Sequence, residues 1–290
     1  MPTMTFELGG RPINRMGFGA MQLPGPGVWG PPRDRDEAIA VLRRAVEGGV
    51  DHIDTAQYYG PDVANDLIRD ALYPYPEGLR IVTKVGGRRG PNKEWLAAAR
   101  PEEIRAGVED NLRSLRLERM PLVNMRLIGQ DDVEGPDVPL AESLGALADL
   151  RDEGKVELIG LSAATAAELE EARALVDIAS LQNHFGILDR EGAELVEVCR
   201  AEGIAFVPFF PLGSAFMGGP AKLAETPAIV EVAARHEATP AQVALAWLLH
   251  FAPNVLLIPG TSSLAHLEEN LGAAELGLDA GDLEALGVGR

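Results

Sequence analysis

Short apolar segments alternate along the chain with longer segments in which apolar residues recur every three or four positions. The short segments have the length of buried strands, and the longer ones have the period of amphipathic helices. Strand candidates lie near 15–20, 50–54, 80–84, 122–128, 156–161, 179–183, 204–209 and 255–258. Because these strand candidates alternate with helices, the pattern predicts a series of eight βα units.

Capping residues mark the starts of several expected helices. Asp34 or Asp36 can cap a helix whose apolar stripe ends before a pair of glycines. Pro101 stands at the first position of another helix. Patterns near 227–236 and 239–251 interrupt the alternation before the last strand, so we expect extra helices near the C-terminus.

A chain of such units can form either an open doubly wound sheet or a closed barrel. A dinucleotide-binding open sheet normally carries Gly-x-Gly-x-x-Gly between its first strand and first helix. In this chain Gly17-Phe18-Gly19 lacks the third glycine and leads into a proline-rich loop instead of a helix. We therefore expect an α/β protein with one domain over residues 1–290, a single (β/α)8 TIM barrel preceded by an N-terminal hairpin.

Charge and composition narrow the class of partner. The formal net charge is −18, so nucleic acids and anionic membranes would repel the protein. No apolar run reaches the roughly 18 residues that a membrane span requires, and no signal-peptide pattern precedes the first strand. We expect a soluble, cytoplasmic protein that acts on a small molecule. The single cysteine, Cys199, excludes an intramolecular disulfide and is expected to be buried.

Polar and aromatic residues fall at or just beyond the last residues of several predicted strands. Barrel enzymes carry their chemistry at this end of the strands, on the loops that lead to the helices. We therefore expect the following side chains to converge on one face: Asp54, Lys84, Arg126, Ser162, Gln182 and Phe209.

Two of these strand ends carry a specific pattern. The segments Ile53-Asp54-Thr55-Ala56-x-x-Tyr59-Gly60 and Val82-Thr83-Lys84 resemble the active-site motifs of the aldo-keto reductases. The resemblance covers nearly the whole chain, through Gly160-Leu161-Ser162, Leu181-Gln182-Asn183, Phe209-Phe210-Pro211-Leu212-Gly213 and the segment from Ile258 to Asn270. It implies reduction of an aldehyde or ketone to an alcohol with NADPH, and NADH is not excluded.

The chemistry of these residues agrees with that implication. Hydride delivery to a carbonyl builds negative charge on its oxygen, and a positioned O–H group lowers the barrier by protonating it. A free tyrosine has a pKa of about 10, which a neighbouring cation lowers. We expect Tyr59 to be the acid, Lys84 to lower its pKa and Asp54 to orient Lys84.

Arg126 departs from the family pattern. The family usually has a histidine at the end of the fourth strand, and Pro121-Leu122-Val123-Asn124-Met125-Arg126 is the matching segment here. An arginine is always charged and only donates hydrogen bonds. Arg126 either donates to the carbonyl oxygen or an anionic group of the substrate, or it pairs with Asp131 or Asp132 away from the site.

The resemblance also implies a cofactor site. Ser162 and Gln182 would bind the nicotinamide carboxamide, Phe209 would stack on its ring, and Asn183 could compensate for Ala163, where the family has asparagine. The segment Phe209 to Gly213 adds Pro211, Leu212 and Gly213 to this site.

Near the C-terminus, Gly260 and His266 replace the lysine and arginine of many NADP-specific relatives. Thr261, Ser262 and Ser263 can still donate to a 2′-phosphate, and His266 can be partly charged. Ser262 and Ser263 also open a helix whose free backbone N–H groups suit an anion. We therefore expect NADPH, with Glu269 and Asn270 at the adenine.

Aromatic residues in the loops predict the substrate pocket. Its expected lining is Met21, Trp29, Tyr58, Trp95 and Phe216, with Arg126 as a cation. Such a pocket suits an aromatic aldehyde as the small-molecule carbonyl substrate. The Val123 to Arg126 variant is similar to a bacterial branch of the family that includes pyridoxal reductases, which implies pyridoxal. The glycine-rich segment 85–100 is expected to be a loop, either closing over the cofactor or simply solvated.

Other functions remain open at this stage. Without the histidine, the barrel could bind NADPH and report its oxidation to a partner with little turnover. A hydrolytic or lyase barrel would need Lys84 as a Schiff-base nucleophile, but the nearby Asp54 would keep that lysine charged. The scattered histidines show no metal-ligand spacing, so we expect no metal.

Overall fold

The computed structural model describes residues 4–128, 138–213 and 218–287. A parallel sheet forms its centre, with strands in the spatial order β3-β4-β5-β7-β8-β9-β10. The strands are β3 (Phe18–Gly19), β4 (His52–Asp54), β5 (Arg80–Arg89), β7 (Met120–Arg126), β8 (Val156–Ser162), β9 (Ile178–Gln182) and β10 (Ala205–Phe206). Each of them lies in, or overlaps, a segment in which a strand was predicted.

The predicted last strand closes this sheet into a barrel. On one side, the Leu257 amide donates to the Arg15 carbonyl at 2.7 Å, and the Gly17 amide donates to the Leu257 carbonyl at 2.8 Å. On the other side, Leu256 donates to the Phe206 carbonyl at 2.9 Å. The segment therefore lies between β10 and β3, and parallel bridges join it to both neighbours. The predicted (β/α)8 barrel is confirmed.

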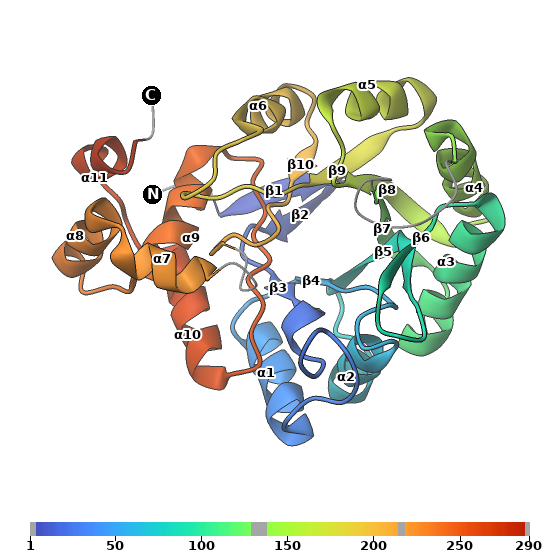
Figure 1. The fold of residues 1–290 in the computed structure, drawn as a ribbon, viewed down its shortest axis with the longest axis horizontal. Helices are drawn as coiled ribbons and strands as arrows, with labels where there is room; N and C mark the ends of the chain where they lie inside the picture. The colour runs from blue at the N-terminus through green and yellow to red at the C-terminus, as the bar shows by residue number, and fades with distance from the viewer. Residues whose placement is uncertain (1–3, 129–137, 214–217, 288–290) are drawn as a thin grey trace.

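A ring of helices surrounds the barrel (Figure 1). These helices are α1 (Arg35–Glu47), α2 (Val63–Leu72), α3 (Pro101–Leu115), α4 (Leu140–Asp152), α5 (Ala166–Leu175), α6 (Ala193–Ala201), α9 (Pro240–Phe251) and α10 (Leu264–Gly272). Of the two cap candidates for α1, Asp34 is the cap, because it accepts from the Glu37 amide. Thr239 caps α9 by accepting from the Gln242 amide.

Three further helices lie toward the C-terminus, at one side of the ring in Figure 1. They are α7 (Gly219–Glu225), α8 (Pro227–Arg235) and α11 (Ala280–Ala285), and two 3-10 turns complete the description, η1 (Ala20–Gln22) and η3 (Ala273–Glu275). A hydrogen bond of 2.6 Å between His236 and Asp282 and an ion pair of 2.9 Å between Arg235 and Asp282 hold α11 against the end of α8. Of these three, only α8 was predicted, near 227–236, and the other predicted extra helix, 239–251, is α9 of the ring.

The predicted N-terminal hairpin consists of β1 (Thr5–Leu8) and β2 (Arg11–Asn14), which pair antiparallel. Its buried residues Leu8 and Ile13 pack with Ala205, Leu256 and other apolar residues of the barrel. Partly buried Leu158 and Ala179, near the starts of β8 and β9, join the same cluster. The hairpin thus covers the end of the barrel at which the strands begin, and the opposite end stays open.

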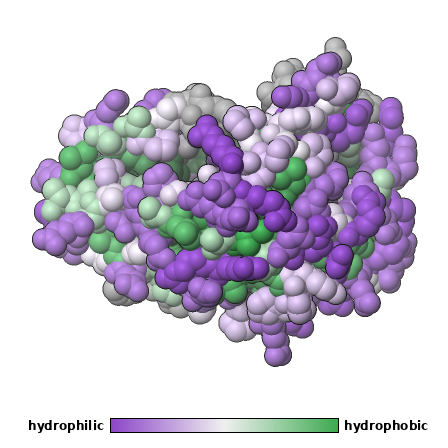
Figure 2. All heavy atoms as spheres, turned by 90° about the horizontal axis from the view of Figure 1, so that it is seen from below, coloured by the Kyte–Doolittle hydropathy of each residue, from purple (hydrophilic) through white to green (hydrophobic). Residues whose placement is uncertain are grey.

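Hydrophilic residues cover most of the face shown in Figure 2, and apolar residues form separate patches between them. Cys199 is buried, as expected, and burial raises the pKa of its thiol to about 12. Across residues 4–128, 138–213 and 218–287, every helix is too short or too polar to cross a membrane.

Candidate active site

A cavity of about 980 Å³ opens at the carboxyl ends of the barrel strands. Strand register explains why polar side chains gather there, because Arg126 is level with Ser162 and Ser162 is level with Gln182 on successive strands. The predicted residues that line the cavity include Asp54, Tyr59, Lys84, Arg126, Gln182 and Phe209. Ser162 is fully buried behind the cavity wall, where its hydroxyl accepts a hydrogen bond from Arg126.

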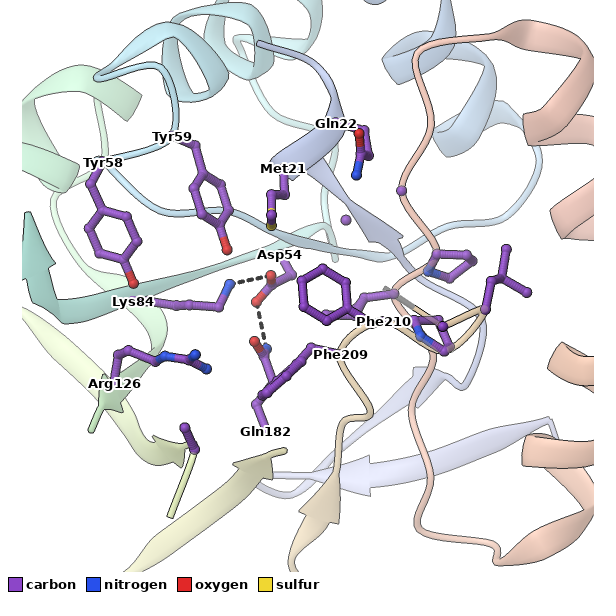
Figure 3. Close-up of a pocket in the computed structure, with 18 of the residues that line it drawn as sticks. Met21, Gln22, Asp54, Tyr58, Tyr59, Lys84, Arg126, Gln182, Phe209 and Phe210 are labelled. Carbon is purple, nitrogen blue, oxygen red and sulfur yellow. Dashed lines mark hydrogen bonds and ion pairs between the residues drawn. The ribbon is translucent and has the colours of Figure 1, made fainter. Parts of the chain in front are cut away.

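Asp54, Lys84 and Gln182 form one buried hydrogen-bonded group (Figure 3). The Lys84 ammonium forms an ion pair with one carboxylate oxygen of Asp54 and donates to the Thr55 carbonyl at 3.2 Å. The Gln182 amide donates to the other carboxylate oxygen at 2.9 Å. Both oxygens of Asp54 therefore have partners, which fixes the direction of the Lys84 side chain.

Tyr59 lies beside this group, and its ring is buried. The Lys84 ammonium is 5.0 Å from the centre of the ring, and the hydroxyls of Tyr58 and Tyr59 both point toward Lys84 (Figure 3). Burial raises the pKa of Tyr59 above its ordinary value, the negative charge of Asp54 raises it further, and Arg126 opposes the change.

The direction of this shift corrects the expectation that Lys84 lowers the pKa of Tyr59. The physical reason is that the Lys84 charge is paired with Asp54, while the phenol has lost its contact with water. In this state Tyr59 carries its proton at neutral pH. A protonated phenol is the form that a proton donor requires.

Arg126 ends β7 and faces the cavity. One of its terminal nitrogens donates to the Ser162 hydroxyl at 3.0 Å, and its guanidinium carbon lies 4.9 Å from the centre of the Phe209 ring. The acids considered as alternative partners, Asp131 and Asp132, lie outside the described residues. A guanidinium has five N–H donors, so a bond to Ser162 leaves others for a ligand.

The residues around Ala163 differ from expectation. The side chain of Asn183, which was considered as a replacement for the carboxamide contact, is bonded to the backbone of Ala164. It accepts from the Ala164 amide at 3.1 Å and donates to the Ala164 carbonyl at 2.7 Å. Asn183 therefore fixes the loop after β8 and has a structural role.

The far end of the same cavity is lined by Gly260, Thr261, Ser262 and His266. Ser263 precedes α10, and its side chain makes no capping hydrogen bond, so amides of the first helical turn remain available to an anion. A Cβ atom on Gly260 would lie 2.5 Å from the Gly19 carbonyl oxygen. Close backbone packing therefore leaves no room for a side chain at this position.

Some of the other residues predicted for the cofactor site line the cavity, and some do not. Pro211, Leu212 and Gly213 line the cavity, next to Phe209 and Phe210. Glu269 and Asn270 do not line it, and the Asn270 side chain is buried. Gln22 and Phe210 also line the cavity, although the sequence motifs gave them no role.

Aromatic rings line the end of the cavity beside Tyr59. Met21, Tyr58 and Trp95 line the cavity, and Tyr58 makes edge contacts with Tyr59 at 5.5 Å and with Trp95 at 5.7 Å between ring centres. Trp29 does not line the cavity, and Phe216 lies outside the described residues.

The segment 85–100 is a β-hairpin, which corrects the expectation of a loop. Strand β5 continues to Arg89 and pairs antiparallel with β6 (Trp95–Ala98). The Arg89 guanidinium carbon lies 4.1 Å from the ring centre of Trp95 and 5.1 Å from that of Trp29. Arg89 also donates to the Val28 carbonyl at 3.1 Å, so it attaches the hairpin to the preceding loop.

In the described part of the chain, no group of three or more His, Cys, Asp or Glu side chains could hold a metal ion.

The sequence of this chain matches the model of the aldo/keto reductase family over residues 15–287. The chain belongs to the aldo/keto reductase family. The predicted family is confirmed, and with it the prediction of an oxidoreductase that acts on carbonyl groups.

Individual relatives of this aldo-keto reductase agree with that membership. It is 48% identical to pyridoxine 4-dehydrogenase of Escherichia coli (strain K12) over 291 residues, which cover 100% of both chains. It is 31% identical to probable aldo-keto reductase 1 of Glycine max, over 94% of this chain and 84% of the relative.

Solved structures show the same fold. A thermostable aldo-keto reductase in complex with the inhibitor epalrestat superposes with a TM-score of 0.81 at 31% identity, over 98% of each chain. An aldo-keto reductase from Klebsiella pneumoniae in complex with NADPH has a TM-score of 0.81 at 24% identity, over 99% of this chain and 94% of that one.

Proposed function

We propose that this aldo-keto reductase uses NADPH to reduce an aromatic aldehyde of the pyridoxal type to its alcohol. The observation that supports this most strongly is a single cavity with a proton donor and a cation at one end and an anion-binding helix start at the other. Tyr59 and Arg126 mark the first end, and Ser262 marks the second.

Tyr59 is the proposed acid. Its hydroxyl faces the cavity, its proton is retained by burial, and a developing negative charge on a carbonyl oxygen would take that proton. Lys84 and Asp54 hold the neighbouring charge in place through their ion pair. When bound, NADPH supplies the hydride that reduces the carbonyl carbon.

The chain's own residues fit the cofactor. Gln182 lies at the base of the cavity, Phe209 offers a ring for stacking, and the first turn of α10 offers backbone N–H groups to a phosphate. Thr261 and Ser262 add hydroxyl donors at the same end. We favour NADPH over NADH on these donors, and the Klebsiella relative in complex with NADPH supports the choice.

The proposed substrate class rests on the aromatic end of the cavity. Tyr58 and Trp95 offer apolar faces to a flat ring, while Arg126 offers N–H donors to a carbonyl or phenolate oxygen. The E. coli relative, named pyridoxine 4-dehydrogenase, matches this class.

A substrate panel tests the proposal. Loss of NADPH absorbance would be followed with pyridoxal, 4-nitrobenzaldehyde, methylglyoxal and a keto-steroid, and each measurement would be repeated with NADH. We expect multiple turnovers with pyridoxal and a higher kcat/KM with NADPH than with NADH. NADPH binding without turnover of any carbonyl would contradict the proposal and favour a redox-sensing barrel.

A further inference from the structure

Behind the Asp54–Lys84 pair, five buried polar side chains form a continuous hydrogen-bonded network. We propose that this network, centred on the Asn65–Asn111 pair, is a positioning device that holds β4 and β5 so that Lys84 stays at the correct distance from Tyr59. The inference rests on the proposed function of Tyr59 and Lys84. The network consists of Thr55, Thr83, Asn65, Asn111 and Ser114.

The two threonines connect the network to the reactive residues. Thr55 directly follows Asp54 on the chain, and Thr83 directly precedes Lys84. Successive side chains of a strand point to opposite faces, so Lys84 faces the cavity while Thr83 faces the helices outside the barrel. The Thr83 hydroxyl donates to the Asn111 side-chain oxygen at 2.6 Å.

Thr55 has a second and more direct link to the site. Its backbone carbonyl accepts from the Lys84 ammonium at 3.2 Å, and its amide donates to the Val82 carbonyl at 2.8 Å. The Thr55 hydroxyl donates to the Asn65 side-chain oxygen at 2.9 Å. A shift of Thr55 would therefore move an acceptor of the ammonium itself.

The asparagines join both strands to two helices. Asn65 on α2 donates to the Asn111 oxygen at 3.0 Å and to the Ser114 hydroxyl at 2.9 Å, and Asn111 on α3 donates to the Gly107 carbonyl at 2.8 Å. Ser114 donates in turn to the Asp110 carbonyl at 2.8 Å. Every side-chain polar group of the network thus has a partner at a defined position.

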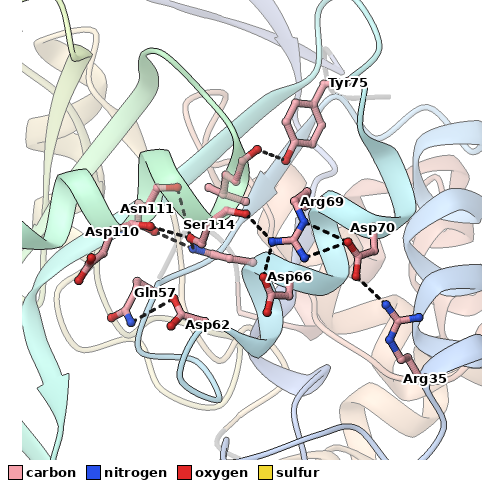
Figure 4. Close-up of polar contacts among 12 residues, drawn as sticks. Arg35, Gln57, Asp62, Asp66, Arg69, Asp70, Tyr75, Asp110, Asn111 and Ser114 are labelled. Carbon is pink, nitrogen blue, oxygen red and sulfur yellow. Dashed lines mark hydrogen bonds and ion pairs between the residues drawn. The ribbon is translucent and has the colours of Figure 1, made fainter.

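An outer layer ties the network to the surface. Arg69 on α2 donates to the Ser114 carbonyl at 3.1 Å and pairs with Asp66 and Asp70 (Figure 4). The contact holds α2 against α3 from outside, so both asparagines remain on elements whose spacing is fixed. A buried polar group without a partner costs about 1–3 kcal/mol, whereas a fully bonded network specifies one arrangement of the elements that it joins.

The experiment removes one hydroxyl at a time. Thr83→Val and Thr55→Val keep the side-chain shape and delete the hydrogen bond, while Thr83→Ser keeps the hydroxyl. Ser143→Ala is the matched control, because the buried Ser143 hydroxyl also donates one hydrogen bond, to the Ala99 carbonyl, away from the cavity. The readouts are kcat and KM for pyridoxal and NADPH, together with the thermal unfolding midpoint.

We expect both valine variants to lower kcat by about 10- to 100-fold, with KM for NADPH changed less than about twofold, because small displacements of reacting groups cost rate rather than ground-state binding. Thr83→Ser should restore kcat to within about threefold of the parent, and Ser143→Ala should leave kcat unchanged even if its unfolding midpoint falls. If one valine variant does not fold, the other still tests the proposal.

Two results would overturn the inference. In one, a folded valine variant keeps the parent kcat while the parent reduces pyridoxal, which leaves the proposed function intact. In the other, Ser143→Ala lowers kcat as much as the valine variants at an equal loss of stability, so that the effect is general. A parent protein that turns over no carbonyl would instead refute the proposed function itself.

Discussion

The protonation of Tyr59 decides what this residue can do. Its phenol is buried between a paired lysine and the cavity, and burial raises its pKa above the ordinary value. The acid form is therefore present at neutral pH and persists as the pH rises through the ordinary tyrosine range. Sequence motifs identified the residue but gave the wrong direction for its shift, because burial and the pairing of Lys84 are properties of the folded site.

This direction can be measured by titrating phenolate absorbance in the parent protein and in Tyr59→Phe, both without cofactor. We expect the two curves to coincide up to about pH 10, since Tyr59 ionises only above that value. The difference between them should develop at higher pH, within the range in which the protein stays folded. A phenolate signal that appears near neutral pH and is absent from Tyr59→Phe would show that the Lys84 charge dominates.

Arg126 should distinguish substrates by their charge. Its guanidinium faces the cavity and bonds to Ser162, so it can donate to an anionic oxygen on a substrate ring. We expect Arg126→Met to lower kcat/KM for pyridoxal by about 10- to 100-fold, as loss of a hydrogen bond to a charged group does. The measurement is the ratio of kcat/KM for pyridoxal to that for 4-nitrobenzaldehyde, which has no phenolate. An unchanged ratio would contradict this role.

Among the elements, the β5–β6 hairpin shows where sequence patterns lose their power. Its glycines and clustered charges lack the alternation of a half-buried strand, and Gly86 takes a positive φ of 96°. Pairing of β5 with β6 stabilises the hairpin, as do the contacts of Arg89 with the rings of Trp29 and Trp95. The pairing with β6 is local but shows no alternation of polar and apolar residues, and the contact of Arg89 with Trp29 joins residues distant in sequence, so local periodicity could not reveal either.

The hairpin positions Trp95, which forms part of the cavity wall and contacts Tyr58. We expect Arg89→Met to raise KM for pyridoxal several-fold with little change in kcat, because the wall loosens while Tyr59 and Lys84 stay in place. Arg88→Met is the matched control, since Arg88 is the exposed neighbour on the same strand. Steady-state kinetics of both variants would check this, and equal KM values in Arg89→Met and the parent would count against it.

At the scale of the whole molecule, the barrel could be predicted because its signal is repeated. Each predicted strand has a counterpart in the closed ring, since buried parallel strands and amphipathic helices differ in period along the entire chain. The positions of the predicted strand ends also indicated that Asp54, Lys84 and Arg126 converge, and all three line one cavity.

The buried polar network could not be predicted in the same way. Asn65 and Asn111 lie on helices among apolar neighbours. The sequence of such a helix does not distinguish a buried, hydrogen-bonded asparagine from one exposed to solvent. Only the packing of α2 and α3 against the barrel brings their side chains to Thr55 and Thr83.

The most direct measurement is NADPH consumption by Tyr59→Phe with pyridoxal at saturating concentrations of both. The substitution removes one hydroxyl from the cavity and leaves the ring, so cofactor binding should be preserved and can be checked by fluorescence titration. We expect kcat to fall by about 10²- to 10⁴-fold, the usual contribution of a positioned acid. A variant that binds NADPH normally and consumes it as fast as the parent would contradict the assignment of Tyr59 as the proton donor.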